Sequence, residues 1–201
     1  MTDDPAADIP HILYFYDAAF APCTRVSLLT ALECTPGPVR VTLHPTDDDA
    51  ALPLDLHALG NVFPEARFAI REVDLSPYAH LPRGRLPLAA RSRLLMPRLH
   101  EGRALYLDGD TLVRRSLRPL WETDLGGACL GAALAPGVQV QCAQVAARAP
   151  GWRKAKEKLA KRSARLDGID MARYVNNGVM LLDLDRIRAI GLDAPMTDIA
   201  A

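Results

Sequence analysis

Short runs of consecutive apolar residues alternate along the chain with stretches in which apolar residues recur at helical spacing. Runs of about four to eight apolar or β-branched residues, bounded by turn-forming residues, are typical of buried strands. Four segments meet this description: residues 12–16, 104–107, 129–134 and 179–184. Residues 39–43, VRVTL, alternate as in a half-buried strand, and residues 67–73 are also expected to form a strand. Between them lie segments with helical character, so the pattern predicts an α/β fold with a mixed, mostly parallel sheet flanked by helices.

The predicted helices are less sharply bounded than the strands. A helix is expected over 24–32 with Thr24 as its N-cap, and another opening in the acidic segment 46–50 and running to about residue 59. The prolines between residues 77 and 87 predict a loop. The last helices are expected over 88–99, ended or kinked by Pro97, over 152–166, and over 186–190.

Acidic residues directly follow two of the predicted strands. Asp17 comes after the run 12–16, and Asp108 and Asp110 come after the run 104–107. In open parallel sheets, ligands bind at the carboxyl ends of the strands. The sequence therefore predicts that both acidic positions lie at one ligand-binding edge.

The tripeptide Asp108-Gly109-Asp110 is a candidate metal site. Two carboxylates at i and i+2 of an extended backbone point to the same side, and Gly109 keeps the space between them open and permits an unusual backbone angle. Hard divalent cations prefer such oxygen ligands and can bridge the phosphates of a nucleoside diphosphate. The alternative is a plain turn after a strand, because Asp and Gly are favoured turn residues.

The surroundings of this tripeptide extend the pattern. The stretch 104–125, ALYLDGDTLVRRSLRPLWETDL, resembles the glycosyltransferases of family 8, in which a strand ending in YLD-x-D is followed by an L-x-x-L(W/F)-x-x-D element. The resemblance implies a GT-A (Rossmann-like) fold and retaining transfer from a UDP-sugar. It also implies that Asp108 and Asp110 hold Mn²⁺ or Mg²⁺ and that Gly109 lies against the donor.

Three further stretches resemble the same family in the same order: residues 12–32, 88–99 and 174–188. The first implies that Phe15 and Asp17 bind the nucleotide. The second implies that Arg91 holds phosphate or donor-sugar hydroxyls and takes part in catalysis, as a planar guanidinium can.

The stretch 174–188 resembles the family's F-N-(A/S)-G-V strand and implies a sugar-binding turn. Its members here are Asn176, Asn177 and Gly178. The family normally continues with a D-Q-D-like element and an H-x-x-G-x-x-K-P-W element, whose histidine is a third metal ligand. Neither element occurs in these 201 residues, so a C-terminally short member is expected.

The function expected from the resemblance is hexose transfer from a UDP-sugar to a glycan or lipopolysaccharide-type acceptor. One alternative is a catalytically incomplete domain that binds a nucleotide sugar without turnover. Another is a phosphatase of the haloacid dehalogenase class, which has a D-x-D-x-T motif. Thr111 directly follows the second aspartate and is one position too early for that motif.

Composition narrows the choice of partners. The chain has 24 basic and 24 acidic residues, whereas nucleic-acid binders usually carry a basic excess. The acidic tail 1–10 lacks the features of a signal peptide, and we expect one domain over 11–201 in the cytoplasm. The basic segment 152–166 could contact an anionic acceptor or a membrane surface, or could be a solvated helix face.

Overall fold

The computed structural model describes residues 9–47, 55–75 and 91–194. Contacts between Cα atoms divide the chain into two compact units. The first unit comprises residues 1–131 and 180–201, and the second comprises residues 132–179. The single domain expected over 11–201 stays a prediction.

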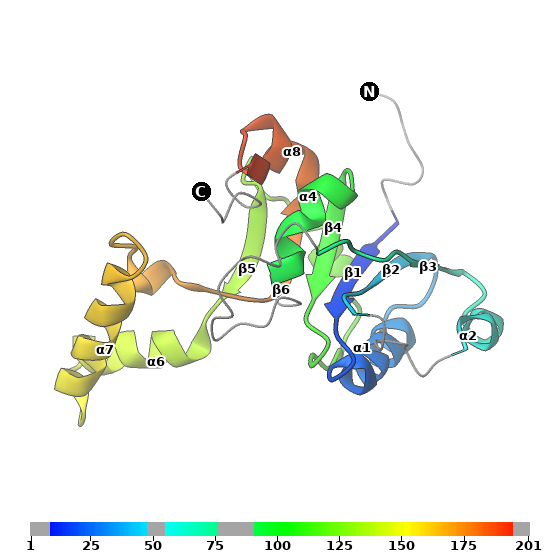
Figure 1. Ribbon diagram of the computed structural model, residues 1–201. Coiled ribbons are helices and arrows are strands. Elements are labelled where there is room, and N and C mark those ends of the chain that lie inside the picture. Colours follow the sequence, from blue (N-terminus) through cyan, green and yellow to red (C-terminus); the bar gives the residue numbers. More distant parts are fainter. Residues whose placement is uncertain (1–8, 48–54, 76–90, 195–201) are drawn as a thin grey trace. The chain divides into compact units, whose positions relative to one another are not determined.

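The first unit contains a parallel sheet built as the sequence predicts. Its strands β1 (His11–Tyr16), β2 (Val39–Pro45), β3 (Ala66–Ile70) and β4 (Arg103–Leu107) are shown side by side in Figure 1. β1 pairs in parallel with β2 on one side and β4 on the other, and β2 pairs in parallel with β3. All six residues of β1 are buried, which explains why this strand reads as a continuous apolar run.

The sheet as a whole has six strands in the order β3-β2-β1-β4-β6-β5. β5 covers Leu130–Leu134 and β6 covers Val175–Asp183. All six predicted strands are present. β6 begins four residues before the apolar run 179–184, because Asn176, Asn177 and Gly178 separate Val175 from that run. The mixed, mostly parallel α/β fold is therefore confirmed.

The helices of the first unit differ from the predictions mainly at their ends. α1 spans Ala21–Cys34 and buries Thr24 completely within the helix. The prediction that Thr24 caps this helix is therefore wrong. The side chain of Asp17 accepts a hydrogen bond from the Phe20 amide at 3.0 Å, and its carbonyl accepts one from the Ala21 amide, so Asp17 stabilises the turn that leads into α1.

α2 (Leu56–Val62) begins after Asp55, whose carboxylate accepts hydrogen bonds from two amides of the first turn. Residues 48–54 and 76–90, where the acidic helix start and the proline-rich loop were expected, lie outside the described residues.

Pro97 does not end the helix expected over 88–99. It lies in the first turn of α4 (Met96–Leu99), directly after the 3₁₀ turn η2 (Arg93–Leu95). Proline is tolerated there because an amide of the first turn has no helical partner. Two further helices, α5 (Arg118–Trp121) and α8 (Leu184–Ala189), complete the described part of this unit.

The second unit consists mainly of a pair of helices that pack together, as Figure 1 shows. α6 covers Pro136–Ala146, and α7 covers Trp152–Ala164. The short 3₁₀ turn η3 (Met171–Arg173) contacts both. α7 confirms the helix predicted from the basic segment, whereas α6 was not predicted. In the part of the chain that is described, no helix is both long and apolar enough to cross a bilayer.

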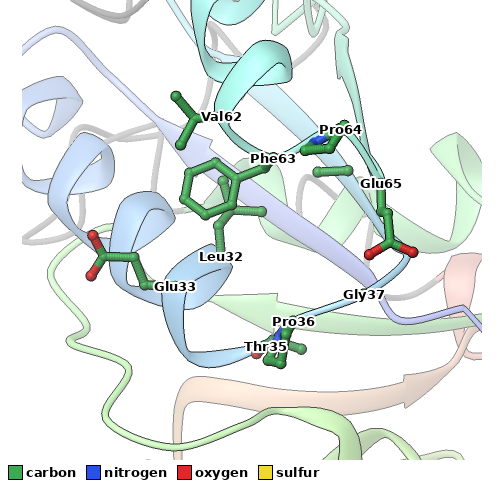
Figure 2. Close-up of a pocket in the computed structure, with 10 residues that line it drawn as sticks. Leu32, Glu33, Thr35, Pro36, Gly37, Val62, Phe63, Pro64 and Glu65 are labelled. Carbon is green, nitrogen blue, oxygen red and sulfur yellow. The ribbon is translucent and has the colours of Figure 1, made fainter.

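A cavity of about 230 Å³ lies at the amino-terminal ends of β2 and β3. Figure 2 shows the ring of Phe63 facing Leu32 there, with the carboxylates of Glu33 and Glu65 pointing away from the ring. Since the strands are parallel, this cavity is at the edge opposite to the one that carries Asp17 and Asp108.

Candidate functional site

The acidic tripeptide follows β4 directly, and its backbone forms a turn. The amide of Thr111 donates to the carbonyl of Asp108 at 3.1 Å, and the Thr111 hydroxyl donates to the same carbonyl at 2.8 Å. The prediction of extended backbone over residues 108–110 is therefore wrong, and the relative direction of the two carboxylates does not follow from strand geometry. A turn remains compatible with metal binding, because it leaves both carboxylates at the carboxyl edge of the sheet.

The parallel pairing of β1 with β4 sets the position of this turn. Leu13 lies opposite Tyr106 in the register, so both strands end at the same edge. Asp17 and Asp108 therefore lie at the same edge of the sheet, as the sequence predicts. Asp17 is half-buried, and its side chain accepts a hydrogen bond from the Phe20 amide at the start of α1.

Two side chains hold the carboxylate of Asp108. The Tyr106 hydroxyl donates to Oδ1 at 2.5 Å, and a guanidinium nitrogen of Arg93 is 2.8 Å from the same oxygen. The Arg93 guanidinium also lies over the Tyr106 ring, 4.9 Å from its centroid. The three groups form one cluster, in which the orientation of Asp108 is fixed by a charged and a neutral donor together.

Electrostatics keep Tyr106 in the form that can donate. Burial raises the pKa of the Tyr106 hydroxyl far above its ordinary value, and the negative charge of Asp108 raises it further, although Arg93 acts in the opposite direction. Tyr106 therefore stays protonated at neutral pH and donates to Asp108.

The two carboxylates suit a hard divalent cation only in part. Both contacts of Asp108 engage Oδ1, and the side chain of Asp110 is exposed. Among residues 9–47, 55–75 and 91–194, no group of three or more His, Cys, Asp or Glu side chains is placed to hold a metal. Mg²⁺ is commonly held by one or two carboxylates together with substrate phosphates. The donor set therefore fits a cation that also takes oxygens from a bound diphosphate.

Gly109 is required by a close contact. Its φ is not positive, so the unusual backbone angle expected from the sequence is absent. A Cβ at this position would lie 2.2 Å from the hydroxyl oxygen of Thr24 on α1 and 3.3 Å from its Cβ. The glycine therefore lets the turn pack directly against α1.

A chain of hydroxyl groups ties the same turn to the core. The Tyr14 hydroxyl is 3.0 Å from the hydroxyl of Ser27, which is 2.8 Å from that of Thr111. Thr111 in turn donates to the carbonyl of Asp108. β1, α1 and the turn are thereby connected by side-chain hydrogen bonds between segments distant in the sequence.

Phe15 lies inside the core. Its side chain is 7% exposed, and its ring stacks on that of His44 with centroids 4.3 Å apart. The nucleotide-binding role implied for Phe15 stays a prediction, but its ring surface is used for packing against His44.

Arg93 is a site residue that the sequence reasoning missed. Arg91 was chosen from the segment RSRLLMPRL, and the arginine two positions later contacts Asp108. Arg91 is half-exposed and is the first residue of the described range 91–194. The donor-binding role assigned to it stays a prediction. The signal for Arg93 was present in the sequence only as a second arginine in the same stretch.

The predicted sugar-binding residues belong to the second unit. Asn176 and Asn177 are exposed on β6 and Gly178 is buried, so these residues form part of a strand and not a separate turn. The amide of Gly178 donates to the side-chain oxygen of Asn176 at 2.7 Å. Their assignment to sugar binding stays a prediction.

Known structures with the same fold are glycosyltransferases. The bifunctional glycosyltransferase WbbM matches with a TM-score of 0.68 and 15% identity, over 92% of this chain and 33% of WbbM. The galactosyltransferase LgtC, solved with donor and acceptor sugar analogues, matches with a TM-score of 0.62 and 26% identity, over 89% of this chain and 59% of LgtC. Mouse xyloside xylosyltransferase 1 matches with a TM-score of 0.58 and 17% identity, over 94% of this chain and 71% of that protein.

The fold is therefore that of the GT-A glycosyltransferases. The sequence profile of Glycosyl transferase family 8 matches residues 88–197, which is more than half of the chain, and the chain belongs to this family. No curated protein sequence matches it. The chain spans about a third of the length of WbbM and 59% of that of LgtC.

Proposed function

We propose that the chain binds a UDP-sugar through a divalent cation and transfers its hexosyl group to a glycan acceptor with retention of configuration. The observation that carries the proposal is the cluster of Arg93, Tyr106 and Asp108 at the carboxyl edge of a GT-A sheet. Support for the substrate class comes from family membership and from LgtC, whose structure holds donor and acceptor sugar analogues.

In this proposal Asp108 and Asp110 are the protein ligands of Mn²⁺ or Mg²⁺. The cation, when bound, would neutralise charge on the diphosphate that leaves the sugar. Tyr106 and Arg93 both bind Oδ1 of Asp108 and are positioning residues, because the two contacts restrict the orientation of the carboxylate. An anchored ligand loses less conformational freedom when the cation binds, which favours affinity.

The remaining assignments concern the donor. Arg91 is proposed to hold phosphate or sugar hydroxyls through its guanidinium. Asn176, Asn177 and Gly178 are proposed to bind the sugar, since an amide side chain offers both a donor and an acceptor to hydroxyl groups. Asp17 and Phe15 are proposed to lie at the nucleotide.

Calorimetric titration with UDP in the presence and absence of Mn²⁺ tests the proposal. Asp108→Asn and Asp110→Asn should each abolish the Mn²⁺-dependent part of UDP binding. Glu122→Gln removes an equal charge at an exposed position of the same unit and should leave binding unchanged. Metal-dependent UDP binding that persists in both aspartate variants would contradict the assignment of Asp108 and Asp110 as metal ligands.

A donor-hydrolysis assay separates the enzyme from the incomplete binding domain. The alternative is a domain that binds a nucleotide sugar without turnover. It is kept because the described residues supply no group of three side chains that could hold a metal. Turnover of a UDP-hexose with Mn²⁺, lost in Asp108→Asn, supports the transferase. Mn²⁺-dependent UDP binding without any hydrolysis or transfer would instead identify a domain that binds nucleotide sugars without catalysis.

A further inference from the structure

Two arginines occupy neighbouring positions at the amino-terminal edge of the parallel sheet. Arg40 of β2 and Arg67 of β3 are partners in the parallel register, and register partners lie on the same face of a sheet, on strands about 4.8 Å apart. Both side chains line a cavity of about 280 Å³. Like charges on adjacent strands repel each other, so this pair destabilises the sheet unless a negative charge compensates it.

The guanidinium of Arg40 contains a buried donor that lacks an acceptor. Its Nε is buried and has no hydrogen-bond partner among the residues that the structure describes. Other half-buried arginines of the first unit do have acceptors: Arg93 contacts a carboxylate, and Arg103 and Arg188 donate to backbone carbonyls. A buried donor without an acceptor is unfavourable, so Arg40 Nε marks a position where an acceptor would be stabilising.

The charge of the pair is only partly balanced within the cavity. The ion pairs recorded for residues 9–47, 55–75 and 91–194 do not include Arg40 or Arg67. Glu65 also lines the cavity, so that two arginines and one glutamate give its lining a net charge of +1. The carboxylate of Glu65 points away from the ring of Phe63 (Figure 2). The cavity therefore favours an anion, but one of low charge.

The neighbouring His11 experiences the same positive charge. It lies opposite Arg40 in the register of β1 and β2. The pKa of His11 is lowered from 6.5 to about 4, by burial first and by the charge of Arg40 second, followed by the charges of Arg71 and His44. His11 Nδ1 is another buried atom that has no partner within the described part of the chain. Positive potential therefore extends from the cavity along this face of the sheet.

Protection of a sheet edge does not account for the pair. Charged side chains on edge strands prevent unwanted pairing with other chains, and β3 is an edge strand of the sheet. This reason is sufficient for the exposed Arg67. Arg40, however, lies on β2, which is paired on both sides, with β1 and with β3. A charged residue on this interior strand needs a different explanation.

We propose that the cavity at Arg40 and Arg67 binds a small organic oxyanion, whose phosphate or carboxylate group lies between the two guanidinium groups. The planar guanidinium matches both kinds of group and can donate two parallel hydrogen bonds to them. A volume of about 280 Å³ is just below the range of drug-sized ligand sites, so the ligand is a small molecule. The cavity lies at the edge of the sheet opposite to Asp108, and the inference does not rest on the proposed function.

Nuclear magnetic resonance of the arginine Nε–H groups tests the proposal. The whole chain is titrated at pH 7 and fixed ionic strength with sodium phosphate and, separately, with sodium acetate, in the presence of EDTA. The Nε–H resonances of Arg40 and Arg67 should shift saturably with one shared dissociation constant. Saturation by only one of the two anions would identify the preferred group. Arg67→Gln should weaken binding roughly 10-fold, and Arg40→Gln by at least as much, since each removes charge-assisted hydrogen bonds.

Further variants separate a built site from general attraction. Arg25→Gln removes an equal charge from an exposed position of α1 and should leave the dissociation constant unchanged. Arg40→Lys keeps the charge but loses the planar fork, and should still weaken binding. Glu65→Gln should tighten binding, more for phosphate than for acetate, because phosphate carries the larger negative charge at pH 7. Bound anion should also raise the pKa of His11, by offsetting the charge of Arg40.

Two outcomes would overturn the proposal. One is the lack of saturable shifts with either anion. The other is a dissociation constant that is the same in Arg67→Gln as in the unmodified chain; because Arg67 is exposed, this variant remains informative if Arg40→Gln does not fold. Asp108→Asn should retain anion binding, and its loss there would assign the anion to the candidate donor site. A failure of this proposal is thus distinguishable from a failure of the proposed function.

Discussion

Three buried histidines predict how the stability of the first unit depends on pH. His44 Nδ1 lies 2.7 Å from the carbonyl of Arg71 and must donate to it, so Nε2 of a neutral His44 accepts from His100 Nε2 at 2.7 Å. The third ring, His11, packs edge-on against His100 with centroids 5.2 Å apart. Protonating His44 would turn its Nε2 into a donor facing another donor and would place a charge in the core.

Burial is the main reason why these histidines resist protonation. It lowers the pKa of His11 and of His44 from 6.5 to about 4. Burial, followed by the charges of the neighbouring histidines, lowers the pKa of His100 to about 3. Between pH 6.5 and about 4 the unfolded chain therefore binds more protons than the native chain, and stability falls as the pH falls.

The size of the effect follows from these values. A histidine whose pKa is 6.5 in the unfolded chain and about 4 in the folded chain lowers the free energy of unfolding by about 2 kcal/mol between pH 7 and pH 5. Three such groups amount to about 5–6 kcal/mol, which is comparable to the whole stability of a small domain. Near pH 5.5 each histidine contributes a slope of about 1 kcal/mol per pH unit.

Urea denaturation at a series of pH values between 5 and 6.5 measures this slope. The Trp152→Phe background restricts the fluorescence signal to Trp121, which is buried in the first unit. His11→Gln should lower the slope of the unfolding free energy by about 1 kcal/mol per pH unit. His57→Gln, at an exposed position of α2, is the matched control and should leave the slope unchanged. A slope that is identical in His11→Gln and the unmodified chain would refute the reasoning.

Three further variants test the packing and the site. Gly109→Ala should destabilise the first unit by about 1–3 kcal/mol, because its Cβ would meet the Thr24 hydroxyl; urea denaturation should show partial recovery on adding Thr24→Ala, and no recovery would contradict the contact. Asp55→Ala removes a helix cap and should cost about 1 kcal/mol by the same assay, so an unchanged midpoint speaks against the cap. Tyr106→Phe should lower Mn²⁺-dependent UDP affinity roughly 10-fold, as expected for loss of a group that orients a metal ligand, and calorimetry showing full affinity would exclude a positioning role for this hydroxyl.

The strands could be predicted because their signal is local. The apolar run of β4 and the polar tripeptide that follows it are adjacent in the sequence, and the parallel pairing of β1 with β4 then places Asp17 and Asp108 at one edge. α6 gave no comparable signal, since its apolar residues Val138 and Val140 alternate with glutamines as they would in a strand. In the structure it is a helix that packs against α7.

The immediate partners of Asp108 could not be predicted because they come from contacts between distant segments. Nothing in the segment 88–99 shows which arginine reaches β4, and the answer depends on the 3₁₀ turn that begins at Arg93. The reason for Gly109 was likewise invisible, since Thr24 is 85 positions away in the sequence and meets the turn only after α1 packs against it.

On the proposed function, the contacts at Asp108 predict that cation and nucleotide bind together. One oxygen of Asp108 is engaged by Tyr106 and Arg93, and the described residues supply no third ligand beside Asp110. A divalent cation held by these two carboxylates would gain further ligands when phosphate oxygens of a bound nucleotide replace some of its water molecules. Coupling between two ligands is reciprocal, so UDP should raise the affinity for Mn²⁺ by the same factor by which Mn²⁺ raises the affinity for UDP. Calorimetric titration of Mn²⁺ with and without saturating UDP measures this factor, and equal Mn²⁺ affinity in both titrations would show that the protein completes the site by itself.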